Sequence, residues 1–324
     1  MARNRIDEAR LRLIQQRQLH DAWGKNYQPA IQATPAEAPS LSTATILHAV
    51  KLGGRAVHTM SRAETWAALL ALHHPGVWDL HEQRILYPGP RPHFLDGHPR
   101  AIGEAFRPLR GTLAVAEEMG CLSRHPKCRV RLGDLEEWAP FPYIGDLLLF
   151  LEDDSGAFSI NWTVKDKSID FHRRGPNPGK PQTHHEDVSA VQRHALESNY
   201  YKDAGIRTQQ VAGAEIDSTL RSNLLRLFLS HSEPLPLSAA VVHKIWGYFS
   251  CEVGGGTAAY KLVKGVAQHL NVAVLAVKNV LEQGIWLRHV AVDLFEPLLL
   301  DRPLKRPQND PLLVYGDWFA RGQS

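Results

Sequence analysis

The segment at residues 145–171 constrains the fold of this chain more than any other. It reads GDLLLFLEDDSGAFSINWTVKDKSIDF, in which two apolar runs, LLLFL and AFSINWTV, flank the polar tetrapeptide DDSG. Apolar and β-branched runs of this length are typical of strands, and Asp, Ser and Gly favour a tight reversal between them. The segment therefore predicts a β-hairpin.

The expected register of this hairpin brings an acid and a lysine together. If the reversal is centred between residues 154 and 155, Asp146 lies opposite Thr163, because the sequence distances to the centre match. Side chains alternate between the two faces of a strand, so Asn161, Thr163 and Lys165 share one face. Asp146 and Lys165 should thus meet at one end of the hairpin.

A helix upstream supplies a second acidic candidate. Ser61 followed by Glu64 has the spacing of a capping box and opens the helix ETWAALLALHHP. Glu64 lies in the first turn of this helix. Two interpretations stay open, since Glu64 can serve only the helix cap and dipole or can also take part in a functional site.

The C-terminal half of the sequence predicts one more helix and one more strand of the first domain. After these, the sequence changes to helical segments typical of a second domain. A helix is expected from about Val188 to the terminating Gly205, followed by the strand TQQVAG. Glu197 on that helix either faces the sheet or is solvated. Beyond Asp217 the chain becomes rich in leucine-containing helical segments and ends in GIWLRHV, which suggests a winged-helix-like bundle with a terminal hairpin. We expect a flexible charged arm at 1–44, a first domain at 45–217 and a helical domain at 218–324.

Composition indicates a folded, soluble protein. Of the 324 residues, 44% are hydrophobic and 22% charged, and no apolar run is long enough to span a membrane. The charged N-terminus is unlike a signal peptide, and three cysteines are an odd number, so we expect reduced thiols and a cytoplasmic location. Cys121 and Cys128 flank His125, but no fourth zinc ligand is evident nearby. The chain has no phosphate-binding loop and no dinucleotide fingerprint, and a net charge of +3 permits DNA binding without arguing for it.

The carboxylates and the lysine together suit metal-assisted phosphodiester hydrolysis. Mg²⁺ prefers oxygen ligands and retains several waters, so two carboxylates and one main-chain carbonyl can hold it. Glu64, Asp146 and the carbonyl of Val164 can provide these oxygens, with Mn²⁺ as a possible substitute ion. Lys165 can orient water and stabilise the developing charge. Alone, an acid followed some twenty residues later by a lysine is a weak signal, because most such pairs are surface charges.

The order of these pieces resembles the TnsA family, the endonuclease subunit of heteromeric cut-and-paste transposases. The resemblance rests on SRAETW with its helix, the strand VWDLHEQ, the hairpin from Asp146 to Lys165, and ALESNYYKDAGIRTQQVAGAEI, which together span about residues 55–217. It implies an α/β restriction-endonuclease-like fold of the PD-(D/E)xK type with a mixed sheet, and it places Glu64, Asp146 and Lys165 at the catalytic positions. The implied activity is cleavage of the 5′ strands at transposon ends.

One position departs from the family pattern. Thr163 stands where the family has Gln or Glu two residues before the lysine. A threonine hydroxyl is a shorter, neutral ligand, so a metal would depend more on the Val164 carbonyl, on water or on Glu197. The departure leaves open a nuclease that is weakened or active only after assembly with its partners.

The expected partners follow from the same resemblance. They are double-stranded DNA at the transposon ends, a DDE-type transposase subunit like TnsB, and an AAA+ ATPase regulator like TnsC, the last bound through residues 218–324. The loop RRGPNPGK, with Arg173, Arg174 and Lys180, is a candidate for phosphate contacts. Two alternatives remain: a stand-alone restriction-like or repair nuclease, and a catalytically silent adaptor of the same complex.

Overall fold

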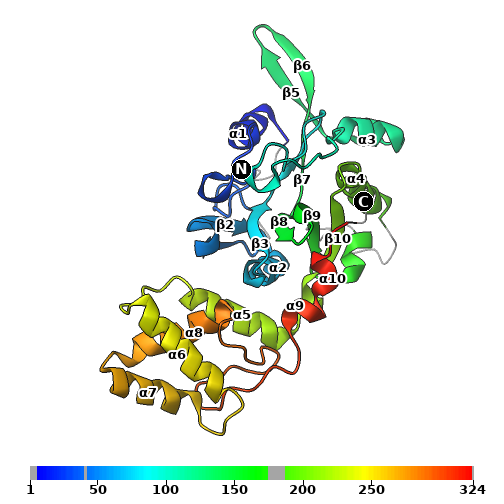
Figure 1. The fold of residues 1–324 in the computed structure, drawn as a ribbon. Coiled ribbons are helices and arrows are strands. Elements are labelled where there is room, and N and C mark those ends of the chain that lie inside the picture. Colours follow the sequence, from blue (N-terminus) through cyan, green and yellow to red (C-terminus); the bar gives the residue numbers. More distant parts are fainter. Residues whose placement is uncertain (1–5, 40–41, 174–186, 323–324) are drawn as a thin grey trace. The chain divides into compact units, whose positions relative to one another are not determined.

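The chain divides into two compact units. The computed structural model describes residues 6–39, 42–173 and 187–322 (Figure 1). The sheet unit comprises residues 1–68, 76–215 and 320–324, and the helical unit comprises residues 69–75 and 216–319. The boundary near residue 215 lies two residues before the one expected at 217. The chain is thus a mixed α/β protein with a separate helical unit.

A four-stranded mixed sheet forms the centre of the sheet unit. Its order is β10-β9-β8-β3, in which β9 runs parallel to β10 while the β9-β8 and β8-β3 pairs are antiparallel. The strands are β3 (Val77–Glu82), β8 (Leu147–Asp153), β9 (Gly156–Lys165) and β10 (Arg207–Ala212). The inner strand β9 is buried at eight consecutive positions, which explains why its sequence is apolar on both faces. The α/β class expected from the sequence is confirmed.

The β8-β9 hairpin has the predicted register. Leu147 pairs with Trp162, and Asp153 pairs with Gly156, so the reversal consists of residues 154–155. Gly156 has a φ of +103°, a backbone conformation that glycine adopts without the steric cost of a Cβ. Continuing the register by one residue places Asp146 at the level of Thr163.

Helix α4 (Val188–Lys202) covers one face of this sheet. Leu196 and Tyr200 of α4 share a buried cluster with Leu148 and Phe150 of β8. The helix ends before Gly205, whose φ is +76°, as the sequence predicts. This packing turns the inner side of α4 toward the strands that carry the candidate residues.

Helix α2 (Arg62–His73) begins close to the end of β10. A Cβ at Gly213 would lie 2.7 Å from the Cβ of Ala63, so only glycine permits this approach. In Figure 1, α2 lies on the other side of the sheet from α4. The start of α2, where Glu64 is located, is therefore fixed against the sheet.

The N-terminal segment is part of the sheet unit, and the expectation of a flexible arm over residues 1–44 is wrong for its described part. Helix α1 (Glu8–Gln18) buries Leu11 and Ile14 in a cluster that also contains Ile85, Cys128 and Phe141. The arm was expected because its sequence is charged and then rich in Pro, Ala and Ser. Its few apolar side chains are nevertheless enough to pack it onto the domain.

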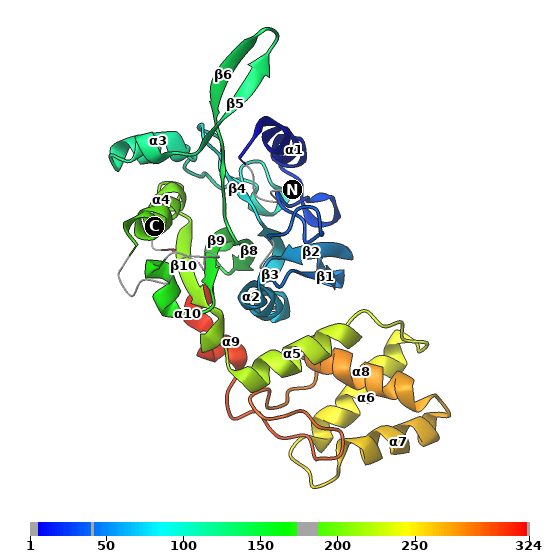
Figure 2. The ribbon, with the colours of Figure 1, turned by 180° about the vertical axis from the view of Figure 1, so that it is seen from behind.

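Three two-stranded sheets and one short helix complete the sheet unit. They are β1 (Thr45–Ala49) with β2 (Arg55–Thr59), β4 (Ile85–Leu86) with β7 (Tyr143–Ile144), β5 (Lys127–Leu132) with β6 (Leu135–Pro140), and α3 (Thr112–Glu118). The β5-β6 hairpin projects from the unit (Figure 2). Cys121 and Cys128 belong to different buried clusters.

The helical unit is built around α8. Its helices are α5 (Ser218–Ser230), α6 (Ala239–Glu252), α7 (Ala259–Leu270), α8 (Val274–Trp286), α9 (Pro311–Val314) and α10 (Gly316–Phe319). Helix α8 contacts α5, α6 and α7, and it is buried along most of its length. Its buried polar residues are partnered, since Glu282 pairs with Arg226 and Lys278 and the Gln283 amide donates to main-chain carbonyls of residues 230 and 233.

The terminal hairpin expected for a winged-helix-like bundle is not formed. Ile285 and Trp286 are the last residues of α8, and residues 287–319, all of them described, contain no strand beyond an isolated bridge between Pro303 and Ala258. The apolar run that suggested a strand continues the helix because it buries both side chains there. Within the described parts of the chain, no helix is long and apolar enough to cross a membrane.

Candidate active site

The end of the β8-β9 hairpin brings Asp146 and Lys165 together. Asp146 directly precedes β8, and Lys165 is the last residue of β9. The Asp146 carboxylate accepts a hydrogen bond of 2.7 Å from the main-chain N–H of Val164, and the Lys165 ammonium nitrogen lies 3.9 Å from the same oxygen, Oδ2. The predicted juxtaposition of these two charged groups is confirmed.

Glu64 makes the predicted cap contact with the Ser61 hydroxyl at the start of α2, while the main-chain donor to its carboxylate is Met60. The main-chain N–H of Glu64 donates to the Ser61 hydroxyl oxygen at 3.1 Å, and that hydroxyl donates to Glu64 Oε1 at 2.9 Å. The main-chain N–H of Met60 donates to Glu64 Oε2 at 2.8 Å. These contacts account for the orientation of Glu64, and Gln83 connects it to Asp146, because Gln83 donates hydrogen bonds both to Glu64 Oε2 and to the main-chain carbonyl of Asp146.

Two carboxylates act on each other in this neighbourhood. Burial and, next, the negative charge of Asp146 raise the pKa of the Glu64 carboxyl to about 7, and the positive charge of Lys165 opposes this shift. The Glu64 side chain is only 7% exposed. A divalent cation between such groups would relieve both the repulsion and the desolvation, so the donor set fits Mg²⁺.

A pocket of about 360 Å³ opens beside the hairpin end. Its walls come from β9, α4 and the segments that precede β8 and α4, and it is lined by Ile144, Asp146, Thr163, Lys165, Arg173, Asp187, Ser189, Ala190, Arg193, His194 and Glu197. Glu64 does not line it. The pocket therefore gathers Asp146, Thr163, Lys165, Arg173 and Glu197 of the predicted residues, while Glu64 lies outside its lining.

Glu197 faces the sheet, which resolves the two interpretations open from the sequence. Its carboxylate is 2% exposed, accepts a hydrogen bond of 3.0 Å from the amide of Asn161, and forms an ion pair of 2.8 Å with Arg193. A Cβ at Gly145 would lie 3.2 Å from Glu197 Oε1, so the glycine before Asp146 leaves space for this side chain. The positive charge of Arg193 balances the Glu197 carboxylate. Glu197 is therefore held at the wall of the pocket by Arg193 and Asn161.

The predicted DNA contacts fall partly within the described chain. Arg173 lines the pocket, directly after the short 3₁₀ helix η5 (Ser168–His172) that follows β9. Arg174 and Lys180 lie outside the described residues. One cation of the predicted loop is thus placed beside Asp146 and Lys165.

Two further residues of the site were missed from the sequence. Gln83, which follows β3, donates its side-chain amide to Glu64 Oε2 at 3.0 Å. His194 lines the pocket from α4, and burial together with Lys165 lowers its pKa to about 4, which leaves the imidazole neutral at physiological pH. Neither residue was assigned a role, because Gln83 appeared only as the last residue of the strand segment VWDLHEQ and His194 has ordinary helix spacing.

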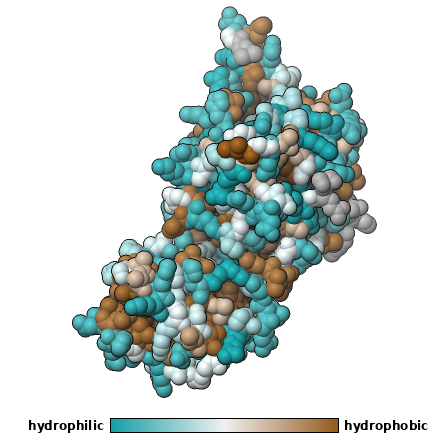
Figure 3. Space-filling view, in the orientation of Figure 1, coloured by the Kyte–Doolittle hydropathy of each residue, from teal (hydrophilic) through white to brown (hydrophobic). Residues whose placement is uncertain are grey.

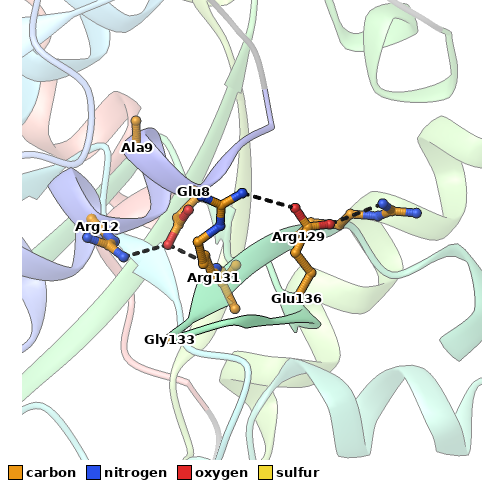
Figure 4. Close-up of a pocket in the computed structure, with 8 residues that line it drawn as sticks. Glu8, Ala9, Arg12, Arg129, Arg131, Gly133 and Glu136 are labelled. Atoms are coloured by element: carbon orange, nitrogen blue, oxygen red, sulfur yellow. Dashed lines mark hydrogen bonds and ion pairs between the residues drawn. The ribbon is translucent and has the colours of Figure 1, made fainter.

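A second pocket, between α1 and the β5-β6 hairpin, carries no comparable chemistry (Figure 4). Its charged residues pair with one another, Arg12 with Glu8 at 2.6 Å and Arg129 with Glu136 at 3.2 Å. Hairpin residues 127–140 contain three cations, Lys127, Arg129 and Arg131, and three acids, Asp134, Glu136 and Glu137. This balance favours neither an anionic nor a cationic ligand.

The buried Glu64 carboxyl should make stability depend on pH. Because its folded-state pKa of about 7 lies above the ordinary value of 4.5, the folded protein holds this proton more tightly than the unfolded chain does. The stabilising contribution is therefore complete below pH 4.5 and is lost as the pH rises through about 7. We expect wild type to lose on the order of 2–3 kcal/mol more unfolding free energy than Glu64→Gln between pH 5 and pH 8 in metal-free buffer.

Urea denaturation of both proteins across this pH range measures the difference. Glu118→Gln is the matched control, since Glu118 is an exposed helix carboxylate of the same unit with 66% side-chain exposure. The control should follow the wild-type pH dependence. Parallel curves for wild type and Glu64→Gln would contradict the raised pKa.

Comparison with known proteins adds no assignment to this geometry. No protein-family model matches the chain, and no curated protein matches it significantly. The candidate site therefore stands on the residues and contacts described above.

Proposed function

We propose that the chain is a Mg²⁺-dependent DNA endonuclease with a restriction-endonuclease-like fold. The observation that carries the proposal is the β8-β9 hairpin end, where Asp146 and Lys165 converge within the electrostatic reach of Glu64. Metal-assisted phosphodiester hydrolysis needs carboxylates to hold the cation and a positive group to stabilise the developing charge. Asp146 and Glu64 provide the carboxylates, and Lys165 provides the positive group. The mixed sheet flanked by α2 and α4 is compatible with this fold.

Magnesium would be held mainly by Asp146. Among the described residues, no three or more His, Cys, Asp and Glu side chains are grouped as a metal site. The remaining ligands would therefore come from the Val164 carbonyl, the Thr163 hydroxyl, water and DNA phosphate oxygens, with Glu64 completing the negative environment. When bound, the ion would polarise the phosphodiester and lower the pKa of a coordinated water.

The protein side chains have separable roles in this proposal. Lys165 places a positive charge where phosphate oxygens become more negative during attack by water, and Arg173 offers a second cation for the DNA backbone. At the α4 wall, Arg193 is paired with Glu197 and the imidazole of His194 is neutral, so Lys165 and Arg173 are the cations available to phosphate. The pocket of about 360 Å³ is large enough to admit a phosphate group.

Within this function we propose the role that the TnsA resemblance implies, cleavage of the 5′ strands at transposon ends together with a DDE-type transposase. The helical unit would bind a protein partner, for which the AAA+ ATPase regulator is the candidate. Its surface exposes Leu229 on α5, Leu275 on α8 and Leu313 on α9, each at least 64% exposed. Figure 3 shows such hydrophobic residues scattered among hydrophilic ones on the visible face of this unit. Exposed apolar side chains of this kind suit protein contacts better than phosphate contacts.

Strand-specific cleavage tests the proposal. The full chain is mixed with the transposase and ATPase of the same element, DNA carrying the element ends, and Mg²⁺, and breaks at the 5′ strands are mapped on sequencing gels. Cutting that depends on Mg²⁺ and on this chain supports the nuclease. If the complex assembles but the 5′ strands stay intact, the chain is a silent adaptor; if the chain cuts equally well alone, it is a stand-alone nuclease.

Thr163 should limit the affinity of the site for magnesium. Its hydroxyl lines the pocket and is a neutral ligand, so Mg²⁺ should bind weakly until DNA phosphates complete the coordination shell. We expect Thr163→Glu to add a charged oxygen beside Asp146 and to tighten Mg²⁺ binding on the order of tenfold in the absence of DNA. Calorimetric titration of both proteins, with and without DNA ends, measures this change.

Thr163→Val is the control for that titration, because it keeps the shape of the side chain and removes only the hydroxyl. It should bind Mg²⁺ no better than wild type. Equal affinity for wild type and Thr163→Glu in every condition would show that position 163 does not reach the metal.

A further inference from the structure

Gln83 adopts a backbone conformation that its side chain does not favour. Its φ is +50°, and it is one of three non-glycine residues with positive φ in the described chain, the others being Asn271 and Arg288. A left-handed conformation is unfavourable for a residue with a long side chain, whereas glycine or asparagine tolerates it. The residue is also 5% exposed, so it is buried as well as strained. A strained, buried glutamine suggests that the side-chain amide itself is needed.

The contacts of Gln83 connect it to both predicted catalytic acids. Its side-chain Nε2 donates to Glu64 Oε2 at 3.0 Å, and its main-chain N–H donates to the carbonyl oxygen of Asp146 at 2.9 Å. The left-handed turn between β3 and β4 is what allows one residue to make both contacts. Gln83 thus spans the distance between α2 and the hairpin.

The other side of Gln83 is held by the N-terminal segment. Its carbonyl oxygen accepts hydrogen bonds from the main-chain N–H of Ala30 at 3.1 Å and from the Gln18 side-chain amide at 3.2 Å. Gln18 is itself 1% exposed, and its Oε1 accepts from the main-chain N–H of Ile85 at 2.9 Å. The segment that follows α1 therefore anchors the turn that contacts the two acids.

We propose that Gln83 is a positioning residue that sets the separation and orientation of Glu64 and Asp146 for metal binding. The inference rests on the proposed function. A neutral amide is suited to this task, because it directs a carboxylate by hydrogen bonding and leaves its negative charge available to a cation, whereas Lys or Arg would neutralise it. The strain at φ +50° is offset by the contacts to Glu64, Asp146 and Gln18.

Two substitutions separate the amide from the backbone strain. Gln83→Met keeps the side-chain length and the strain but removes the donor, and Gln83→Gly removes the donor and relieves the strain. We expect both to weaken binding of Mn²⁺, used as a paramagnetic probe and measured by electron paramagnetic resonance on the full chain, by about 10- to 100-fold. Gln83→Gly should keep or raise the melting temperature, since it relieves the strain.

Asn271→Gly is the matched control, because it makes the same kind of backbone change at φ +52° in the helical unit. It should bind Mn²⁺ as wild type does. Wild-type affinity in both Gln83→Met and Gln83→Gly would overturn the positioning role, while loss of binding in Asp146→Asn would still support the metal site. Absence of Mn²⁺ binding by wild type itself in the presence of DNA ends would overturn the proposed function and this inference together.

Discussion

Asp146→Ala should abolish DNA cutting while the protein stays folded. The Asp146 carboxylate is the expected principal metal ligand, and it lies at the end of the hairpin, where little apolar packing depends on it. We expect 5′-strand cleavage by the assembled complex to fall by at least ~10²-fold, because loss of a preorganised charged group at a phosphoryl site has effects of this size. Initial rates on end-containing DNA at saturating Mg²⁺ measure the loss.

Asp146→Asn makes this test more specific. Asparagine keeps an oxygen that can accept the hydrogen bond from the Val164 N–H, so the start of β8 should retain its local structure while the charge is lost. Glu152→Gln is the control on the same strand, since Glu152 forms only an exposed ion pair with Arg100 and should leave cutting unchanged. Near-normal cutting by both Asp146 variants would remove Asp146 from the active site.

Lys165→Met should also eliminate most of the cutting, but by a different route. Lys165 is expected to stabilise charge that develops on the phosphate, so its removal should lower the cleavage rate about 10²- to 10³-fold. Binding of Mg²⁺ should persist or become slightly tighter, because a positive charge 3.9 Å from Asp146 has been removed. The Asp146 variants should therefore lose both cleavage rate and Mg²⁺ affinity. Lys165→Met should lose cleavage rate but keep its Mg²⁺ affinity.

The neighbouring Lys167 provides the control for this substitution. Lys167 lies two residues further on, at an exposed position beyond the end of β9. Lys167→Met should cut DNA at a rate within about threefold of wild type, since it removes an equal charge outside the pocket. A similar loss of cutting in both variants would mean that general attraction of DNA, and not a specific role of Lys165, explains the effect.

Local patterns were sufficient to predict the hairpin and the acid-lysine pair. Strand alternation and the turn residues specify which side chains oppose one another, so the pairing of Leu147 with Trp162 could be derived by counting from the reversal. The capping box at Ser61 and Glu64 was predicted for the same reason, because its hydrogen bonds join residues three positions apart. Such short-range geometry is encoded within a few residues.

The N-terminal segment and the end of the helical unit were predicted wrongly for related reasons. Charge and proline content favoured a flexible arm over residues 1–44, yet Leu11 and Ile14 are buried against residues more than 70 positions away. The segment IWLRHV at 285–290 fitted a strand as well as a helix end, and burial of Ile285 and Trp286 extends the helix to Trp286, after which no strand forms. Periodicity cannot distinguish these cases when the burying partner is remote in sequence.

Strand alternation and cap spacing were enough to predict the hairpin register and the helix start at Glu64, while the family resemblance singled out Glu64, Asp146 and Lys165 as candidate catalytic residues. Tertiary contacts were needed to find that Glu197 turns inward to Arg193 and Asn161, and that Gln83 hydrogen-bonds the Glu64 carboxylate and the main-chain carbonyl of Asp146. The difference lies in the range of the interactions involved. Turns and caps depend on neighbouring residues, whereas burial, charge coupling and a strained bridging residue depend on elements that folding brings together from distant parts of the chain.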